Sequence, residues 1–557
     1  MSPLPRSFRR LAAAAMASAL TAAAVAAQQP RTAAPAHMGL GAAPPPIRTE
    51  ADLARFLDDL EAQQWALDRA TALESYAQWK GEPLHRTEAM TRLVNDLSTR
   101  RDYARVIDQW KARVKDSTLA RRLQVQANYF LAAKADPALA VRLGELQTAI
   151  QDSFRQFRFQ LDGRALTQTQ LSIILDTTAD RTVRRRAWEA IPKLGESTQP
   201  MIRQAMGMND RIGRQEGFQS GAASQLSLSG LTPTQVLRDL TSFEQATRPT
   251  YEALLARIAR DLKIEKAEAW DLDYWFHLQE QQVAADAYPV SQAMPRIRAL
   301  ATGMGFNVDS LPITVTIYDV PTGGIAFPIR PAYEARLLSN PFPGARFYTV
   351  LFHEYGHTLH AVLIRPDLPL SLLSFDPQPG TEGLGETLGH FAFDRRFLAR
   401  AGGVNPEQAA GLERLGKLEQ LLWLRRTIGA NAYAEIQGYF DLTANFDSVY
   451  ADAYRRFVGV DLPPGDYAWT RDFFGTAPLY FPAYLYANMF ATQVREAMRK
   501  EFGTEDLTRE PRVAGWLTRN FYGPGQSIPW QEKVRRATGR PLDSRSLVEF
   551  LAVDVGR

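Results

Sequence analysis

Apolar residues recur three and four positions apart over most of this chain, and this helical spacing constrains the fold more than any other sequence feature. The pattern begins at Thr49, which can cap a helix together with Asp52 three residues later. It continues through the segments 89–115, 120–162, 167–190, 198–216 and 233–262, with few turn clusters between them. The spacing therefore predicts a mainly α protein.

One stretch departs from the helical spacing. Residues 313–320 (ITVTIYDV) alternate in character and are rich in β-branched side chains, which predicts a strand. Residues 321–327 (PTGGIAF) follow with a glycine pair, which indicates a turn into a second strand. Helical spacing returns at about residue 346 and dominates to the end. We therefore expect a small β-sheet just before the helix that starts there.

The first 27 residues have the three-part layout of a secretory signal. Arg6, Arg9 and Arg10 form a basic start, and an Ala-rich apolar run over 11–27 ends in small residues that favour cleavage. A membrane anchor is the alternative, but the run is short for a span of roughly 20 residues and consists mostly of alanine. We therefore expect residues 1–27 to be removed and the protein to be secreted or periplasmic.

The remaining composition is that of a soluble globular protein. Residues 28–48 are rich in Pro, Ala and Gly and predict a flexible lead-in to one catalytic region over 49–557, which can comprise two subdomains. The chain has no cysteine, so neither a disulfide nor a lipid-modified N-terminal cysteine can form. Removing the three signal arginines reduces the formal charge from +4 to +1. Such a chain has no electrostatic reason to bind nucleic acid or to stay on a membrane. Its oligomeric state is left open.

The segment 347–362 (FYTVLFHEYGHTLHAV) contains His353 and His357 with Glu354 between them. On a helix the two histidines lie on one face, about 6 Å apart along the axis, so both imidazoles can bind one zinc ion. Glu354 is rotated by roughly 100° and can accept the proton of a water molecule instead. We predict two ligands of a single Zn²⁺ ion and Glu354 as the general base of a hydrolase. A chance match is the alternative, but apolar residues precede the motif, as a buried helix requires.

A catalytic zinc ion takes three protein ligands and keeps one position open for water. Downstream of the motif the sequence breaks at a Pro-Gly pair, and helical spacing restarts at about Thr381. Glu382 and Glu386 then lie four residues apart on one helix face. We predict Glu382 as the third ligand and Glu386 as the acceptor of a ring N–H from a ligand histidine. A solvated helix face is the alternative for these two acids.

Two further histidines are alternative ligands. His360 lies on the turn after His357, where we expect it to pack as a neighbour, and His390 follows the helix of Glu382.

With this pattern the sequence resembles the glutamate-zincin (gluzincin) metallopeptidases. The spacing from HEYGH to Glu382 is similar to that of the angiotensin-converting-enzyme-like peptidyl-dipeptidases and of the thimet oligopeptidase and oligopeptidase F group. EGLGE over 382–386 is similar to the converting-enzyme family, whereas HEYGHTLH over 353–360 is closer to the oligopeptidases. Shorter matches extend the resemblance from about residue 180 to the end.

The resemblance implies a nearly all-helical fold with two halves around a deep cleft, and substrates limited to short or unfolded peptides. It also implies an edge strand that holds the substrate backbone. Residues Gly323 to Phe327 are in the matching place, and Ala326 and Phe327 are the candidate substrate contacts. Tyr484 and Tyr486 lie where both families keep a tyrosine that stabilises the oxyanion, and Tyr480 is a further candidate substrate contact. An aromatic core position is the alternative for each tyrosine.

The sequence departs from both families shortly before these tyrosines, where each family has a histidine. This chain has no histidine after His390, and Phe474 or Pro478 stands in the expected place. A missing donor of this kind is worth about 10²–10³-fold in rate. The zinc motif and Glu354 lead us to expect a zinc metallopeptidase acting as a peptidyl-dipeptidase or oligopeptidase. The missing histidine motivates the alternative, a peptide-binding protein with a relic zinc site.

The cleavage mode remains open between endopeptidase, peptidyl-dipeptidase and carboxypeptidase. A C-terminal trimmer needs a cation for the substrate carboxylate, and no spacing selects Arg471 or Arg495 for that role.

Overall fold

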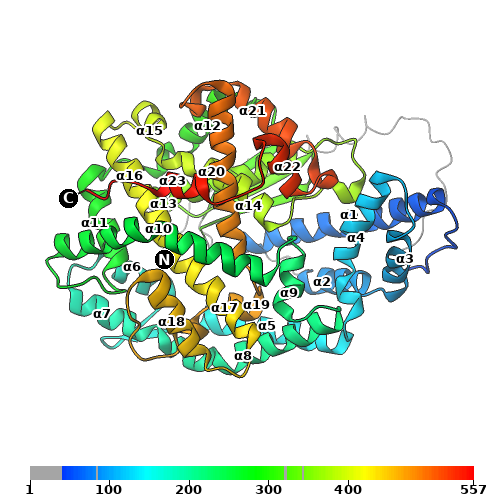
Figure 1. Cartoon of the computed structure of the whole chain (residues 1–557), viewed down its shortest axis with the longest axis horizontal. Helices are drawn as coiled ribbons and strands as arrows, with labels where there is room; N and C mark the ends of the chain where they lie inside the picture. Colours follow the sequence, from blue (N-terminus) through cyan, green and yellow to red (C-terminus); the bar gives the residue numbers. More distant parts are fainter. Residues whose placement is uncertain (1–40, 83–85, 319–322, 342–343, 557) are drawn as a thin grey trace, which may run out of the picture. The chain divides into compact units, whose positions relative to one another are not determined.

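Helices make up most of the computed structural model, which describes residues 41–82, 86–318, 323–341 and 344–556 (Figure 1). The predicted signal over 1–27 and most of the lead-in over 28–48 lie outside the described residues. By their contacts, residues 43–557 form one unit, and every element below belongs to it. Among the residues described, none of the helices has the length and apolar character to cross a membrane.

The helices of the first part of the chain are α1 (Glu50–Trp79), α2 (Thr87–Ser98), α3 (Arg101–Lys111), α4 (Ser117–Tyr129), α5 (Pro137–Gln156), α6 (Gln168–Thr177), α7 (Arg181–Ala190), α8 (Pro192–Gln215), α9 (Gly221–Ser227), α10 (Pro233–Leu262), α11 (Leu272–Ala284) and α12 (Ala293–Gly303). Those of the second part are α13 (Ala345–Val362), α14 (Gln378–Gly389), α15 (Arg395–Ala401), α16 (Pro406–Trp423), α17 (Asn431–Phe440), α18 (Phe446–Val458), α19 (Phe473–Thr476), α20 (Pro482–Phe502), α21 (Arg512–Leu517), α22 (Trp530–Thr538) and α23 (Arg545–Leu551). The prediction of a mainly α fold is confirmed.

The first helix begins where its capping residues predict. The Asp52 backbone N–H donates to the Thr49 hydroxyl at 3.1 Å, and the Thr49 N–H donates to the Asp52 carboxylate at 2.9 Å. This reciprocal pair satisfies two backbone donors that a helix start leaves free. The apolar face that follows on α1 buries Leu53, Phe56 and Leu60 almost completely.

The prediction of unbroken helical character over 120–162 is wrong at its end. A short antiparallel hairpin of β1 (Phe159–Leu161) and β2 (Arg164–Leu166) follows α5. Its turn consists of Asp162 and Gly163, with φ of 51° and 74°. An Asp-Gly pair is a strong hairpin signal because both residues tolerate the left-handed conformation. That turn chemistry outweighs the helical spacing around it.

A three-stranded sheet lies just before α13, as predicted, but its pairing differs from the expected hairpin. The strands are β3 (Ile313–Ile317), β4 (Gly324–Arg330) and β5 (Glu334–Ser339), in the order β3-β5-β4. The unpredicted β5 is central, parallel to β3 and antiparallel to β4. Charged residues at 334 and 336 hide its strand character, although Leu337 and Leu338 are fully buried. β4 is therefore an edge strand, and residues 319–322 lie outside the described part.

Helix α13 packs on this sheet through β4 and β5 and also contacts α14, which in turn packs against the distant helix α20 (Figure 1). α14 starts at Gln378, slightly earlier than predicted, and includes the Pro-Gly pair that we expected to break the chain. Proline is compatible with the first turn of a helix, where its missing N–H has no intrahelical partner.

Candidate functional site

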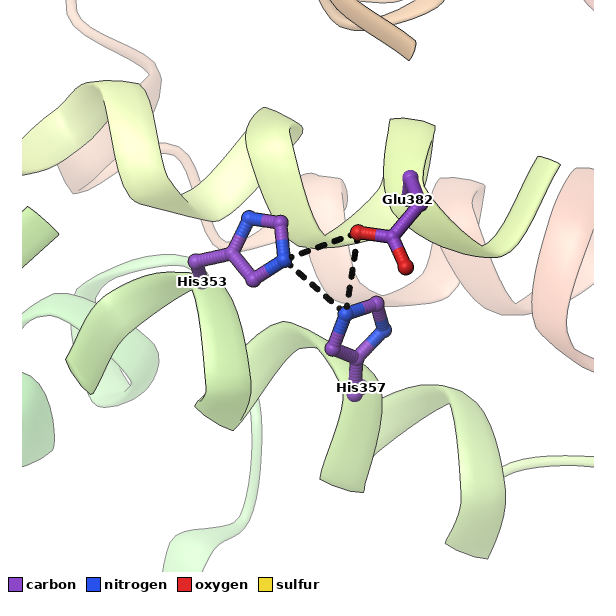
Figure 2. A group of neighbouring side chains, drawn as sticks. All are labelled: His353, His357 and Glu382. Atoms are coloured by element: carbon purple, nitrogen blue, oxygen red, sulfur yellow. Dashed lines mark hydrogen bonds and ion pairs between the residues drawn. The ribbon is translucent and has the colours of Figure 1, made fainter. Parts of the chain in front are cut away.

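Helix α13 carries both histidines of the HExxH motif on one face. Its first turns bury Phe347, Leu351 and Phe352 completely in the main hydrophobic core, which holds the helix in place. Nε2 of His357 lies 2.9 Å from Nε2 of His353, so the two rings point to the same place (Figure 2).

Glu382 on α14 points to the same place. Its Oε2 lies 3.1 Å from Nε2 of His353 and 3.6 Å from Nε2 of His357 (Figure 2). The three ligand atoms lie within 4.8 Å of one another, and no other such group of His, Cys, Asp and Glu occurs in the described ranges. Two imidazole nitrogens and one carboxylate oxygen are the ligand atoms that zinc prefers.

Negative charge surrounds the two imidazoles. Burial by itself disfavours a charged His353, but the hydrogen bond to Glu382 and the charges of Glu386, Glu382 and Glu354 raise its pKa to about 9. Burial likewise disfavours a charged Glu382, yet His357 and His353 hold the pKa of this carboxyl well below its usual range. Ring nitrogens this close together in a negative environment favour a bound cation. The donor set therefore fits a divalent metal ion.

Glycines allow α13 and α14 to approach closely enough for this grouping. A Cβ on Gly356 of α13 would lie 2.9 Å from the carbonyl oxygen of Leu384. A Cβ on Gly385 of α14 would lie 2.8 Å from Cε1 of His353. Both distances are shorter than real Cβ contacts, so the absence of side chains at these positions brings Glu382 within reach of the histidines.

Glu386 lies one turn after Glu382, behind the first histidine. One of its carboxylate oxygens is 3.5 Å from Nδ1 of His353, and the other is 3.3 Å from Nε2 of His390. The same nitrogen of His390 lies 3.0 Å from Oδ1 of Asn488 on α20. Glu386 therefore lies beside the second ring nitrogen of His353, where a carboxylate can orient the ring of a metal-binding histidine.

The structure places the two alternative histidine ligands outside the group. His360 is fully buried, stacks on Phe375 at 4.7 Å, and has its Nδ1 3.4 Å from the Thr381 hydroxyl. Burial, with the nearby charges of Lys533 and His357, keeps its pKa well below the usual value. His360 is a packed neighbour, and His390 contacts the group only through Glu386.

Glu354 lies beside this group and faces β4. A Cβ on Gly324 would lie 2.9 Å from Cγ of Glu354, so the glycine lets the edge strand pass directly over the glutamate. None of the described residues forms a hydrogen bond or an ion pair with the Glu354 carboxylate. The carboxylate is therefore available to a water molecule or a substrate.

Two of the three predicted tyrosines lie near Glu382 and Glu354: Tyr480 just before α20 and Tyr484 in its first turn. The hydroxyls of Tyr480 and Tyr484 are 2.7 Å apart, and the Tyr484 ring packs edge-on against Trp423. Burial, followed by the charge of Glu382 and a smaller effect of Glu354, raises the pKa of both hydroxyls. Both therefore keep their protons at neutral pH and can donate hydrogen bonds.

Tyr486 lies elsewhere. Its hydroxyl donates to Oδ2 of Asp239 on α10 at 2.7 Å, and its ring is buried. Residues two apart on a helix are separated by about 200° around the axis, so Tyr484 and Tyr486 cannot both face one site.

Sequence reasoning missed a strained position directly before these tyrosines. Leu479 has a φ of 58°, a left-handed conformation that costs of order 1–3 kcal/mol for a residue with a side chain. Its N–H donates to Oε1 of Glu435 at 2.9 Å, and Glu435 on α17 is fully buried. Burial raises the pKa of Glu435 to about 8, and the Leu479 N–H only partly offsets this effect. A buried carboxyl thus holds the backbone that presents Tyr480.

The residues predicted to hold the substrate lie on β4. Ala326 pairs with Leu337 of β5, so the opposite edge of the strand is free of sheet pairing among the described residues. The Phe327 side chain is buried and packs edge-on against Tyr76 of α1 at 5.2 Å. The β4 backbone, rather than the Phe327 ring, is what a ligand can reach.

A cleft of about 890 Å³ opens beside Tyr480. Residues of α1 and α4 line it together with the segments 370–379 and 476–480. Pro328 and Ile329 of β4 also line it. A cleft between early and late parts of the chain agrees with the expected architecture.

Four other positions singled out in the sequence lie outside the metal-ligand group. Phe474, in the place of the missing histidine, is fully buried, whereas Pro478 lines the cleft. Arg495 is buried beside Asp394 at 3.4 Å, and Arg471 donates to the Tyr450 hydroxyl at 3.4 Å. Neither arginine is among the described residues that line the cleft.

The helical fold and the HExxH-plus-glutamate group define a metallopeptidase, and comparison with known proteins bears out this class. The family model of Peptidase family M3 matches residues 174–304, and that of the Carboxypeptidase Taq (M32) metallopeptidases matches residues 444–555. Both describe metallopeptidases. Among curated proteins, none matches the sequence.

Solved structures share the fold across nearly the whole chain. The M32 carboxypeptidase from Deinococcus radiodurans R1 matches with a TM-score of 0.64 and 15% identity, covering 89% of this chain and 97% of its own. A protein called BsuCP matches with a TM-score of 0.63 and 16% identity, over the same shares of the two chains. At such identities the likeness establishes the fold.

Proposed function

We propose that this chain is a zinc-dependent peptidase that trims short or unfolded peptides from their C-terminal end. The observation that carries the proposal is the convergence of His353, His357 and Glu382. The Glu354 carboxylate lies beside them, and the described residues offer it no ion-pair partner. C-terminal trimming is supported by the M32 carboxypeptidase family match and by the name of a structural neighbour. A peptidyl-dipeptidase or an oligopeptidase shares the same chemistry and differs in where the cut falls.

In this proposal the two histidines and Glu382 hold one zinc ion, and Glu386 orients His353. When bound, zinc polarises the scissile carbonyl and lowers the pKa of water. Glu354 accepts the proton of the attacking water and passes it to the leaving amine. Its lack of an ion-pair partner in the described structure supports this role, because a neutralising cation would weaken it as a base.

Tyr484 donates a hydrogen bond to the oxyanion that develops on the scissile carbonyl, and Tyr480 orients the Tyr484 hydroxyl. The 2.7 Å contact between the hydroxyls and their raised pKa values support these roles. The free edge of β4 pairs with the substrate backbone by strand addition, and its closeness to Glu354 at Gly324 supports that placement.

Export from the cytoplasm is a separate part of the proposal. The basic start and Ala-rich run over residues 1–27 support removal of this segment and activity in the periplasm or outside the cell.

Mass spectrometry of a mixed peptide pool, incubated with the purified zinc-loaded protein, tests the proposal. Stepwise loss of single C-terminal residues is the expected result, and a chelator or the Glu354→Gln variant should abolish it. Release of dipeptides or internal cleavage would contradict C-terminal trimming and favour the other two modes. Peptide binding without any cleavage would favour the relic site.

A further inference from the structure

The cleft is lined by an acidic residue, Asp68, for which the described residues offer no partner. Trp65 and Asp68 lie three residues apart on α1, and therefore on one face of the helix, and both line the cleft. Tyr129, the last residue of α4, lines it beside them. We define Trp65, Asp68 and Tyr129 as the α1–α4 subsite.

Asp68 differs from the other acids of the cleft. The Glu61 carboxylate accepts from Arg122 at 2.8 Å and from the Ser371 hydroxyl at 2.6 Å. Asp376 pairs with Lys533 at 2.7 Å. The described residues offer Asp68 no hydrogen bond and no ion pair.

The surroundings of Asp68 leave its charge uncompensated. The side chain is open to the cleft, but the walls remove enough hydration to raise its pKa to about 6, and no cation opposes this effect. Arg69 also lines the cleft, but adjacent helix residues are separated by about 100°, so its guanidinium faces a different direction.

The hydroxyl of Tyr129 is the second unpartnered group. It is buried and forms no hydrogen bond within the described structure. Burial raises the pKa of the Tyr129 hydroxyl, and the negative charge of Asp68 raises it further. The hydroxyl is therefore close enough to the carboxylate for an electrostatic interaction. A carboxylate and a hydroxyl that accept hydrogen bonds, next to an indole ring, suit a cationic group with several N–H donors. A neutral or anionic ligand would leave Asp68 unpaired.

We propose that the α1–α4 subsite binds a cationic group of the peptide substrate, either the α-ammonium or a Lys or Arg side chain, on the N-terminal side of the cleaved bond. This assignment rests on the proposed function. A peptidase that removes C-terminal residues keeps the rest of the peptide on the N-terminal side of the cut. Tyr480, Pro328 and Ile329 of β4 and the α1–α4 subsite line one and the same cleft, so that part of the peptide can extend along it to the subsite.

Four peptides with a common C-terminus test the proposal: with or without an N-terminal acetyl group, and with or without one internal lysine. For Asp68→Asn we expect kcat/KM to fall about 10- to 100-fold for the cationic peptides, mainly through KM, and to stay unchanged for the acetylated peptide without lysine. If the fall in kcat/KM depends only on whether the N-terminus is acetylated, the bound group is the α-ammonium. If it depends on the internal lysine, the bound group is the side chain. Arg69→Gln is the matched control, and it should leave the preference for cations intact.

The subsite would be overturned if Asp68→Asn lowered kcat/KM equally for all four peptides, or for none of them. The proposed function has a separate test, because it fails if the wild-type protein cleaves none of the four. Calorimetric titration of the same peptides into Glu354→Gln, with and without Asp68→Asn, then decides the subsite independently of turnover. Weaker binding of only the cationic peptides supports it, and equal binding contradicts it.

Discussion

Gly385 lies against the imidazole of His353, so that a Cβ at this position would be 2.8 Å from Cε1 and 2.9 Å from Nε2 of the ring. Because the ring is packed between α13 and α14, it cannot move away without leaving the position in which it meets His357 and Glu382. The close approach of two helices and the metal-binding geometry therefore depend on the same residue.

We expect Gly385→Ala to lose most of its metal affinity and activity while it keeps its helical content. Metal content of the purified protein and circular dichroism measure the two effects. Gly207→Ala on α8 is the control, because no atom lies within 4 Å of the added methyl group. That variant should be slightly stabilised, by up to about 1 kcal/mol, as a helix glycine is replaced by alanine. Full metal occupancy in Gly385→Ala would show that the ring has room to move.

Glu354→Gln should bind metal as the wild-type protein does and lose at least about 10²–10⁴-fold in kcat, the usual contribution of a general base. Elemental analysis and steady-state kinetics test both parts of this expectation. Retention of most of the activity would remove Glu354 from its assigned role.

Tyr484→Phe should lower kcat by about 10²–10³-fold with a small change in KM, as expected for a donor that acts in the transition state. Tyr486→Phe is the matched control on the same helix, since its hydroxyl donates to Asp239. It should keep its kcat and lose about 1 kcal/mol of stability with that hydrogen bond. If Tyr486→Phe lowered kcat and Tyr484→Phe did not, Tyr484 would not be the oxyanion donor.

Glu386→Ala should weaken metal binding by about 10- to 100-fold, because it removes the carboxylate behind His353 and leaves the ligands in place. Competition with a chromophoric chelator measures the affinity. Glu407→Ala, an exposed acid on α16, should leave the affinity unchanged. Equal affinities in the two variants would deny Glu386 its positioning role.

Glu435→Gln should change how stability depends on pH. Because the pKa of Glu435 in the folded protein, about 8, exceeds its ordinary value of 4.5, the protonated carboxyl stabilises the fold. That contribution is complete below about pH 4.5 and is lost as pH rises towards 8. The neutral amide does not titrate, so the variant should gain stability relative to the wild type by about 1 kcal/mol per pH unit across this window. Denaturant unfolding at pH 5 and pH 8 gives the free energy of unfolding of both proteins. If the variant and the wild type differed by the same amount at both pH values, Glu435 would already be ionised at pH 5.

Part of the fold could be read from local patterns. The capping pair of Thr49 and Asp52, the helical spacing of α1 and the strand β3 depend on residues a few positions apart, and all three occur where predicted. β5 was missed because its two charged residues obscure the pattern, and because a central strand is defined by partners on both sides. The parallel pairing of β3 with β5 cannot be seen in either segment alone.

The pairing of His353 with His357 could be predicted from the sequence, because the 3.6-residue repeat of a helix places positions four apart on one face. Glu382 could be predicted as the third ligand because helical spacing restarts just before it and a catalytic zinc ion takes three protein ligands. Three relationships could not be predicted from the sequence. Tyr484 rather than Tyr486 lies near this group, Glu435 accepts a hydrogen bond from the Leu479 N–H, and Asp68 lines the cleft without a partner among the described residues. Those relationships join residues that are distant in sequence, or depend on the rotation of a helix in the core, and the packing of the whole chain sets them.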